Sequence, residues 1–324
     1  MTQTLLDDSV IFHDHQPEGL SLYDAVVEGL SLPRKEIPPK IFYDERGSRL
    51  FDEICDQPEY YLPDAERTLL VNCIEEIAEL TGKGRVVIEP GAGSLAKIRL
   101  LLDALQPSAY VPMDISANYL QDAALELSAD FPELPIHATC VDFTHSLPVP
   151  DPVPDNPRLA FFPGSSLGNF HHDEALAFLT RIHDALDQHG MLLIGVDTKK
   201  SSSVLDAAYN DAAGVTAQFN LNLLRRIRQE LEADCDVSGF DHHAFYNSDE
   251  GRVEMHLVSK QEQEVRINGH RFQFMPGETV HTECSYKYAP DEFLELASKA
   301  GFAPLKHWLA ENELFGVYLL KVDH

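Results

Sequence analysis

The feature that most constrains the fold is a regular alternation of strand-like and helix-like segments between about residues 86 and 198. Apolar runs are separated by amphipathic helical stretches; the runs are RVVIEPGAG, AYVPMDIS, IHATCVDF, RLAFFPGSSLGNF and MLLIGVDT. Strands that alternate with helices along a chain form a parallel sheet with helices on both faces. The sequence therefore predicts an α/β fold built on a doubly wound sheet.

This alternation stops near residue 203, and a segment of a different kind follows. A long helix-like stretch, LDAAYNDAAGVTAQFNLNLLRRIRQELEAD, precedes polar strand-like segments. The chain then ends in a helix, PDEFLELASKAGF, and two strands in HWLAENELFGVYLLKV, a closing pair common in methyltransferases that use S-adenosylmethionine (SAM). We predict a Rossmann-like core of residues 62–202 and 287–324, and an α+β substrate domain of residues 10–61 and 203–286.

The first helix of the core has recognisable ends. Asp64 is predicted to be the N-cap of the segment AERTLLVNCIEEIAELTG, because a short acidic side chain can accept from the first free N–H groups of a helix. Gly82 is predicted to end this helix, since glycine readily adopts the left-handed conformation found there.

The charge balance excludes several classes of partner. The chain has 25 Lys and Arg residues against 53 Asp and Glu residues, a net charge of −28. Such a protein repels nucleic acids and anionic membranes. We find no apolar run of about 20 residues, and the segment MTQTLLDDSV lacks the features of a signal peptide. The five scattered cysteines, without CxxC spacing, fit free thiols in a reducing cytoplasm, and we expect a monomer.

A glycine loop at the end of the first strand is the first candidate binding site. In VVIEPGAGSLAKIRLLL, Gly91 and Gly93 lie between a strand and a helix, where glycines let the backbone approach a ligand. The N-terminus of the following helix favours negative charge. The loop also matches the dinucleotide pattern GxGxxG/A, so by itself it is a weak signal.

Acidic residues after the next two strands favour SAM over a dinucleotide. Asp114 ends the second strand, where the ribose hydroxyls of either cofactor need an acceptor. Asp142 and Phe143 follow the third strand, where a carboxylate can accept from an adenine amino group and a ring can cover the base. Glu89 before the loop suits a cationic sulfonium better than a pyrophosphate. Each acid could also be a helix cap or a solvated loop carboxylate.

The histidine pairs do not predict a metal site. They lack the spacing that places two ligands on one face of a helix or strand, and we interpret them as surface histidines: His13/His15, His171/His172 and His242/His243.

The segment HTECSYKY, residues 281–288, reads as a strand with two different faces. Its side chains alternate, so Glu283, Ser285 and Lys287 share one face. The other face carries Thr282, Cys284 and Tyr286. From the pattern alone, the first face is either a solvated edge or a polar binding surface.

From about Pro38 to its C-terminus the chain resembles the histidine-specific N-α-trimethyltransferases of ergothioneine biosynthesis, the EgtD family. The resemblance rests on ordered motifs: PPKIFYDERGSRLFDEICDQPEYY, PGAGSLAK, PMDIS, VDF, PGSSLGNF, AYNDAAGVTAQFN, YNSDEGRVEMHL and TECSYKY. It implies a class I SAM-methyltransferase fold and an enzyme that converts L-histidine to hercynine, its trimethylated betaine, with three molecules of SAM.

The resemblance also implies roles for individual residues. SAM would be bound by residues of the core: Gly91, Gly93, Lys97, Asp114, Asp142 and Phe143. Asn169 and Tyr209 would hold the substrate carboxylate and orient its amine, while Glu283 and Ser285 would hold the imidazole. Tyr43 and Tyr60 would position the amine and could relay its proton, and Met255 would form a wall of the pocket. Periodicity alone is also compatible with a role in core packing for Tyr60, Tyr209 and Met255, and with a turn position for Asn169.

Two other functions remain open at this point. The same fold could act on tryptophan or another amino acid, or the chain could bind SAM and an amino acid without catalysis. An indole has one N–H donor and no ring acceptor, so a carboxylate beside a hydroxyl fits an imidazole better.

Overall fold

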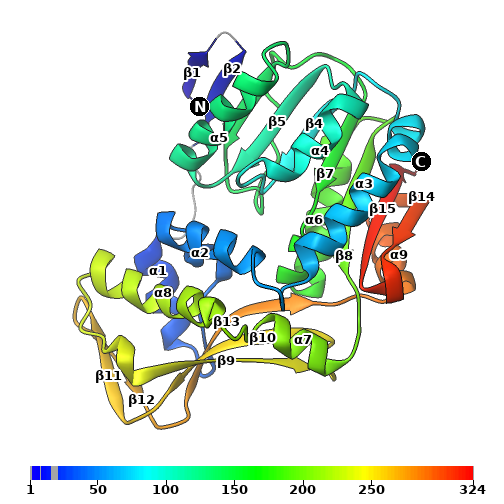
Figure 1. The fold of residues 1–324 in the computed structure, drawn as a ribbon. Coiled ribbons are helices and arrows are strands. Elements are labelled where there is room, and N and C mark those ends of the chain that lie inside the picture. The colour runs from blue at the N-terminus through cyan, green and yellow to red at the C-terminus, as the bar shows by residue number, and fades with distance from the viewer. Residues whose placement is uncertain (1, 8, 16–20, 324) are drawn as a thin grey trace. The chain divides into compact units, whose positions relative to one another are not determined.

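The chain folds into two compact units, each built from separate stretches of sequence. A computed structural model describes residues 2–7, 9–15 and 21–323. The first unit comprises Met1–Glu18, Leu62–Thr198 and Tyr288–His324, and the second Gly19–Tyr61 and Lys199–Lys287 (Figure 1). The roles predicted for the two domains, cofactor binding and amino-acid binding, stay predictions.

The described residues of the first unit form a nine-stranded sheet in the order β1-β2-β6-β5-β4-β7-β8-β15-β14. The strands from β2 to β8 in this order are parallel, and β1, β15 and β14 each run antiparallel to their neighbour. The strand bounds are Thr2–Asp7 (β1), Val10–Asp14 (β2), Val86–Pro90 (β4), Ala109–Asp114 (β5), Ile136–Cys140 (β6), Arg158–Phe162 (β7), Met191–Asp197 (β8), Phe302–Leu309 (β14) and Phe315–Val322 (β15).

Helices pack on this sheet and make its central strands inaccessible to water. All residues of β4 and β6 are buried, as expected for parallel strands covered on both faces. Helix α3 packs on α4, and α6 on α9 (Figure 1). The helices are Leu62–Thr81 (α3), Ala96–Leu105 (α4), Ala117–Asp130 (α5), His172–Ala185 (α6) and Pro290–Lys299 (α9). The predicted doubly wound α/β fold is confirmed.

The first core helix begins earlier than predicted. Helix α3 starts at Leu62, so Asp64 lies in its first turn and is not its N-cap. Pro63 explains the difference, because proline suits the first turn of a helix, where a free N–H is not needed. Gly82 follows the last helical residue with φ of +74°, as predicted for a helix end.

The second unit contains a four-stranded sheet in the order β3-β13-β10-β9 and a separate β11-β12 hairpin. Strand β3 is parallel to β13, and the other neighbours are antiparallel. The strands are Lys35–Glu36 (β3), Phe240–Asn247 (β9), Arg252–Ser259 (β10), Gln263–Ile267 (β11), His270–Phe274 (β12) and Thr279–Tyr286 (β13). The helices are Leu22–Ser31 (α1), Glu45–Cys55 (α2), Ser202–Ala208 (α7) and Val215–Glu230 (α8), with short 3₁₀ turns at Pro39–Phe42 and Val237–Gly239.

The long helix-like stretch after residue 203 is two helices and not one. Helices α7 and α8 are separated by a turn in which the Asp211 carboxylate accepts from the backbone N–H of Val215 at 2.7 Å and of Thr216 at 2.8 Å. Gly214 takes a φ of +71° directly before α8. Asp211 therefore caps α8, and this break leaves Tyr209 at the end of α7.

A β-bulge divides the residues of β13 between the two faces of its sheet. Met255 pairs with Glu283 and His256 with His281, so Thr282 is the extra residue. Glu283 and His281 are two residues apart and would share a face in a regular strand. Because of the bulge, Glu283 faces the helices with Met255, and His281 faces the opposite side with His256. The hydroxyl of Thr282 bonds to the Asn220 side chain of α8 at 2.8 Å, so Thr282 is on the helix side and not, as predicted, with Cys284.

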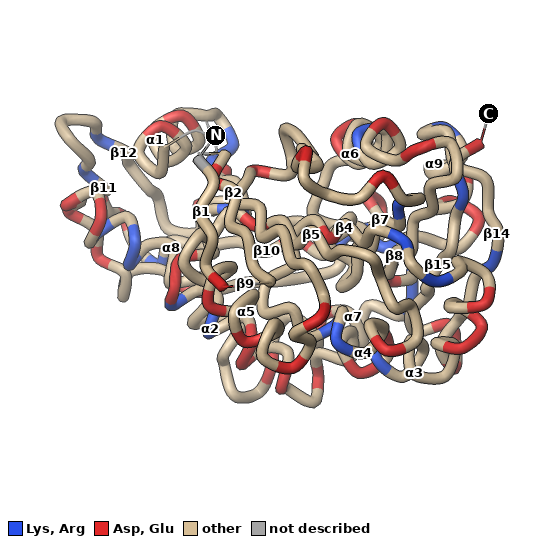
Figure 2. The backbone as a smooth tube through the Cα atoms, turned by 90° about the horizontal axis from the view of Figure 1, so that it is seen from above, with Lys and Arg blue, Asp and Glu red and all other residues tan. Residues whose placement is uncertain are grey.

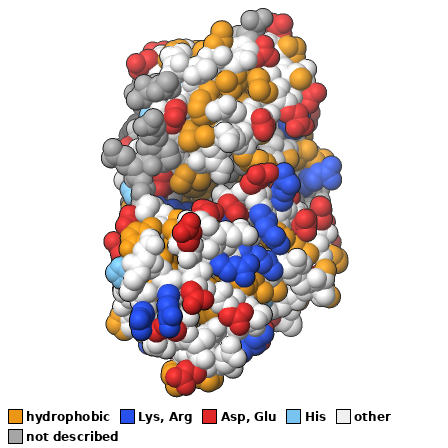
Figure 3. Space-filling model, turned by 90° about the vertical axis from the view of Figure 1, so that its left-hand side faces the viewer, with side chains coloured by type: hydrophobic (Ala, Val, Ile, Leu, Met, Phe, Trp, Pro, Cys, Tyr) orange, Lys and Arg blue, Asp and Glu red, His pale blue; other side chains and the backbone are white. Residues whose placement is uncertain are grey.

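Acidic residues outnumber basic ones in this chain, 53 to 25. Figure 2 shows them distributed along helices and loops rather than gathered in one segment. On the face in Figure 3, basic, acidic, apolar and uncharged side chains are interspersed. No helix among the described residues is long and apolar enough to cross a membrane.

Of the histidines predicted to lie on the surface, His13 is buried and His242 is partly buried. His13 is fully buried on β2 and stacks on His137 of β6, with ring centroids 5.4 Å apart. His242 on β9 lies 2.9 Å from the backbone carbonyl of Tyr209 through its Nε2. Both belong to strands whose pairing could not be read from local spacing.

Candidate active site

The glycine loop lies at the point where the parallel strand order reverses, between β4 and β7. In open α/β sheets this is where ligands bind. Gly91 and Gly93 have φ angles of +68° and +55°. The N–H of Gly93 donates to Asp114 Oδ2 at 3.1 Å, which links the loop to the end of β5. A side chain at Gly91 would begin 3.2 Å from the ring of Phe143, so this glycine leaves a space beside that ring.

Asp142 and Phe143 complete this group after β6. Asp142 Oδ1 accepts from the N–H of Thr144 at 3.0 Å, and Asp142 Oδ2 lies 3.2 Å from His145 Nδ1. The Phe143 ring packs on Phe162 and Phe178, with centroids 6.3 and 5.8 Å away. The structure therefore brings Gly91, Gly93, Asp114, Asp142 and Phe143 to one edge of the sheet.

Lys97 is tied to a residue that the sequence analysis did not identify. Its Nζ donates to Glu66 Oε2 of α3 at 2.7 Å, and Glu66 Oε1 accepts from the N–H of Gly164 at 2.8 Å. Glu66 is 1% exposed and connects two helices to the loop after β7. The sequence pattern that could have identified Glu66 is its spacing, because it shares one face of α3 with the buried residues Leu62, Leu69 and Leu70.

Glu89 contributes less negative charge to this edge than its residue type suggests. Burial raises its pKa to about 8, against the effect of its hydrogen bond with Tyr110 at 2.5 Å. The protonated, neutral form of Glu89 therefore predominates at pH 7. Burial also raises the pKa of Asp114, opposed by backbone hydrogen bonds from Ser116 and Gly93. Glu89 was predicted to suit a cationic sulfonium, but the raised pKa means that it carries little negative charge at pH 7.

The second unit contains a small pocket between α2, α8 and the helix-facing side of its sheet. Four residues predicted for substrate binding line it, together with apolar and aromatic neighbours: Phe51, Ile54, Tyr60, Ala208, Tyr209, Thr216, Phe219, Met255 and Glu283. Tyr60, Tyr209, Met255 and Glu283 come from four separate stretches of the chain. No local pattern in the sequence shows that they meet, and the fold of the unit brings them together.

The tyrosines of this pocket are held by their surroundings. The rings of Tyr60 and Tyr209 contact edge to face, with centroids 5.9 Å apart. The pKa of Tyr60 is raised well above its usual value, first by burial and then by the charges of Tyr209, Cys55 and Glu283. Tyr60 therefore keeps its hydroxyl proton at pH 7.

A buried lysine, Lys287, lies beside the acid of the pocket. It is 1% exposed, and its Nζ donates to Ser285 Oγ at 2.9 Å and to the Tyr209 hydroxyl at 3.2 Å. Burial raises the pKa of Glu283 to about 7, and the charge of Lys287 lowers it in part. The strand pattern placed Lys287 on this face, but the sequence analysis gave it no role.

The other predicted substrate residues lie outside the lining of this pocket. Ser285 is connected to the pocket through Lys287, whose ammonium donates both to Ser285 Oγ and to the hydroxyl of the lining residue Tyr209. Tyr43 is one layer behind, edge to face with Phe51 at 5.8 Å and Phe219 at 5.9 Å. Asn169 belongs to the first unit, at the end of the 3₁₀ turn Ser166–Asn169.

A comparison with known families settles the relationship of this chain. Residues 22–322 match the family described as "Histidine-specific methyltransferase, SAM-dependent". The chain belongs to this family. The match confirms the predicted resemblance, the SAM cofactor and a methyltransferase that acts on histidine.

Individual relatives agree with this assignment. The chain is 37% identical to a histidine N-alpha-methyltransferase of Mycolicibacterium smegmatis, over 90% of this chain and 92% of that protein. It is also 37% identical to one of Mycobacterium tuberculosis, over 96% and 98%. A third relative is Ergothioneine biosynthesis protein 1 of Schizosaccharomyces pombe, 30% identical over 90% of this chain and 39% of that protein.

Solved structures bear on the fold alone. A SAM-dependent methyltransferase from Clostridium acetobutylicum superimposes with a TM-score of 0.51 at 13% identity, over 85% of this chain and 99% of that chain. The likeness agrees with the class I SAM-methyltransferase fold predicted from the sequence.

Proposed function

We propose that this protein methylates the α-amine of L-histidine three times with SAM and yields hercynine for ergothioneine biosynthesis. The observation that carries this proposal is the buried pair of Glu283 and Lys287 at a pocket lined with aromatic rings, in a chain of the histidine-specific family. A buried carboxylate is costly unless a ligand or neighbour compensates it, so its presence here calls for a polar partner.

The polar groups of the pocket suit an imidazole. Ionised Glu283 would accept a hydrogen bond from one ring N–H. Because the Lys287 ammonium already donates to Ser285 Oγ, the hydroxyl hydrogen of Ser285 is free to be donated to the other ring nitrogen. Lys287 thus acts as a positioning residue that orients Ser285 and favours the ionised form of Glu283. An indole, with no ring acceptor, would leave the Ser285 donor unsatisfied.

The edge of the first unit fits the cofactor. The space that Gly91 leaves beside Phe143 would take an adenine ring, and the carboxylates of Asp114 and Asp142 would accept from ribose hydroxyls and from the adenine amine. Gly93 and Lys97 would complete this site. When bound, SAM supplies a methyl group activated by a positively charged sulfur. The protein residues then have to hold and orient the two reactants, which can lower a barrier by about 7–11 kcal/mol.

The amine must be neutral when it attacks. Since Tyr60 keeps its proton at pH 7, its role is to hold the amine by a hydrogen bond rather than to act as a tyrosinate base. Tyr60 and Tyr209 also offer ring faces to the growing quaternary cation, each contact contributing about 0.5–2 kcal/mol. The ammonium proton can leave to water before each of the three transfers, and the quaternary product of the third transfer carries no N–H proton.

The roles of Asn169 and Tyr209, which come from the resemblance, are kept as proposals with a direct test. Asn169 and Tyr209 are proposed to hold the substrate carboxylate, and Asn169→Ala should raise the KM for histidine. Histidine methyl ester, which lacks the carboxylate, should bind the wild type and this variant equally. A monomer and a cytoplasmic location are proposed from the acidic composition and the five free cysteines.

A product assay tests the proposed function. The protein is incubated with SAM and each proteinogenic amino acid in turn, and products are detected by mass spectrometry. We expect histidine to gain the mass of three methylene units and tryptophan to be unchanged. Methylation of tryptophan at a comparable rate would favour the alternative acceptor, and the absence of product from every amino acid would favour a binding protein without catalysis.

A further inference from the structure

A cluster of metal-ligand residues occupies the other side of the sheet from the pocket. Glu254 and His256 are two residues apart on β10, and His281 is opposite His256 on β13. One ligand atom from each lies within 4.8 Å of the others. We propose that Glu254, His256 and His281 bind a divalent transition-metal ion of the Zn²⁺ type. This proposal does not rest on the methyltransferase function.

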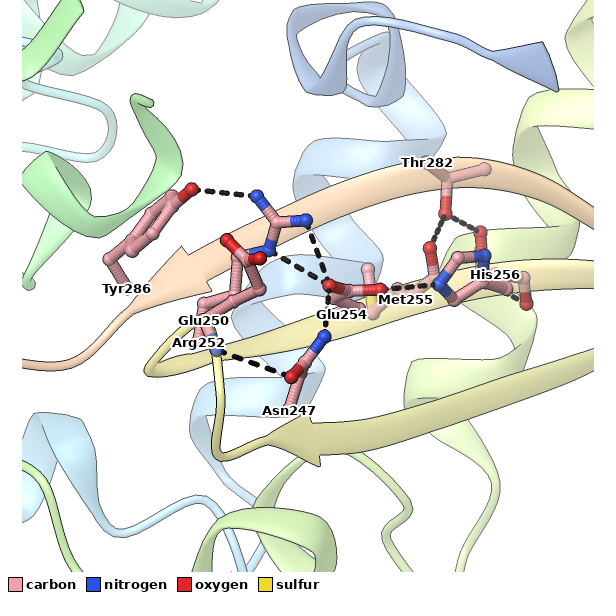
Figure 4. Close-up of polar contacts among 9 residues, drawn as sticks. Asn247, Glu250, Arg252, Glu254, Met255, His256, Thr282 and Tyr286 are labelled. Carbon is pink, nitrogen blue, oxygen red and sulfur yellow. Dashed lines mark hydrogen bonds and ion pairs between the residues drawn. The ribbon is translucent and has the colours of Figure 1, made fainter. Parts of the chain in front are cut away.

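The geometry of the first two ligands suits a metal. Figure 4 shows Glu254 and His256 side by side along β10, with Glu254 Oε2 directed at His256 Nε2. The two atoms are 3.1 Å apart. Two ligands at about 2.0–2.1 Å from a tetrahedral Zn²⁺ are separated by roughly 3.3 Å, so an ion could bridge this pair with little movement. Without an ion, the two atoms share a hydrogen bond.

His281 offers the third nitrogen. Its Nε2 is buried and has no hydrogen-bond partner among the described residues, while the ring makes a hydrogen bond to the backbone of Glu283. That bond must use Nδ1, which leaves the Nε2 lone pair available. Metal-binding histidines almost always have their second nitrogen held in this way.

Glu254 is oriented by a second set of contacts. Its Oε1 accepts from Arg252 Nε at 2.9 Å and from Asn247 Nδ2 at 3.0 Å, which leaves Oε2 on the side of His256 (Figure 4). Supporting hydrogen bonds of this kind are typical of carboxylates that bind metals. The positive charge of Arg252 opposes a cation here, so we expect weaker binding than at a closed structural site with four ligands.

The bulge at Thr282 is what assembles this cluster. In a regular strand His281 and Glu283 would share a face, and His281 would lie in the pocket side of the sheet. The extra residue places His281 opposite His256, with ring centroids 5.0 Å apart, and leaves Glu283 on the helix side. A bound ion would therefore hold the same bulge that positions Glu283.

The test is a titration of the full-length protein, first treated with a chelator, with ZnCl₂ by calorimetry. We expect one ion per chain, and a dissociation constant at least tenfold higher in His281→Ala and in Glu254→Gln. His270→Ala removes an exposed histidine of the same unit from β12 and should leave binding unchanged. Thermal unfolding of the metal-free variants checks that each one folds.

A spectroscopic measurement keeps the proposal falsifiable if one variant folds poorly. Co²⁺ added to the chelator-treated protein should give visible absorption bands of a low-coordinate nitrogen and oxygen site, and Zn²⁺ should displace them. His256→Gln should abolish the bands. Binding that does not saturate at one ion per chain, or that is equal in wild type, His281→Ala and Glu254→Gln, would mean adventitious surface binding and would overturn the proposal.

Discussion

The glycine-loop edge of the first unit and the pocket of the second unit are built in different ways. At the edge, neighbouring parallel strands end at the same level, and the conformation of the backbone forms the site. Two glycines have positive φ, one of them leaves a space beside Phe143, and the N–H of the other donates to Asp114. In the pocket, side chains from separate elements meet around a buried acid, and a buried lysine bonds to the hydroxyl of the lining residue Tyr209. The first site is therefore sensitive to shape and the second to charge.

The largest effect is expected from a change of shape at the edge. Gly91→Val would place a branched side chain at φ of +68° and 3.2 Å from the Phe143 ring. We expect the affinity for S-adenosylhomocysteine (SAH) to fall about a hundredfold, from strain of roughly 1–3 kcal/mol and loss of the space itself. Calorimetry with SAH measures it.

Gly82→Val is the matched control for this substitution. It has a similar φ of +74° in the same unit, but a side chain there meets nothing within 4 Å. An equal loss of SAH affinity in both variants would show that backbone strain, and not the space beside Phe143, determines the effect.

A change of charge in the pocket should be nearly as large. Glu283→Ala removes a charge-assisted hydrogen bond worth about 1.5–3 kcal/mol, so the dissociation constant of histidine should rise at least tenfold. SAH affinity should barely change. Glu250→Ala, in the exposed turn before β10, is the control. If histidine bound equally well to Glu283→Ala and Glu250→Ala, the imidazole would have to be held elsewhere.

The pocket should also respond to pH through Glu283. Its pKa of about 7 means that the carboxylate becomes protonated as the pH falls through neutrality. We expect histidine to bind SAH-saturated protein more tightly as the pH is raised from about 6 to 7.5, with a bend near the pKa. In Glu283→Gln the bend should be absent; its persistence would assign it to the ligand alone.

Lys287 should set where that bend occurs. Lys287→Met removes the charge that lowers the pKa of Glu283, so the bend should move to higher pH by about one unit. At neutral pH histidine binding should weaken roughly fivefold and recover at higher pH. Lys287→Arg, which keeps the charge, should restore much of the wild-type profile. A weakening independent of pH would mean that Lys287 acts through packing alone.

The last effect concerns the stability of the edge and not ligand binding. Glu89 has an ordinary pKa near 4.5 when unfolded and about 8 when folded, so between these values only the folded state holds the proton. Its contribution to stability therefore falls as the pH rises. Relative to its difference from the wild type near pH 5, Glu89→Gln should gain roughly 3–4 kcal/mol of stability near pH 8 in denaturant unfolding. A pH-independent difference would contradict the raised pKa.

The same contrast explains what the sequence could predict. The α/β order and the cluster of Gly91, Asp114 and Phe143 follow from residues at the ends of consecutive strands, where local pattern and position in space coincide. The break between α7 and α8 was missed because helical periodicity continues across Tyr209 and Asp211. The bulge at Thr282 and the role of Lys287 depend on contacts between distant segments, which no local pattern contains, whereas the burial of Glu66 follows from its place on the apolar face of α3.

The central claim is that a buried carboxylate, tuned by a lysine, selects histidine. Calorimetric titration of the SAH-bound protein with histidine and then tryptophan tests it most directly. We expect saturable histidine binding, at least tenfold weaker in Glu283→Ala, and no measurable tryptophan binding to the wild type. Comparable affinities for the two amino acids, or a histidine affinity that does not depend on Glu283, would contradict it.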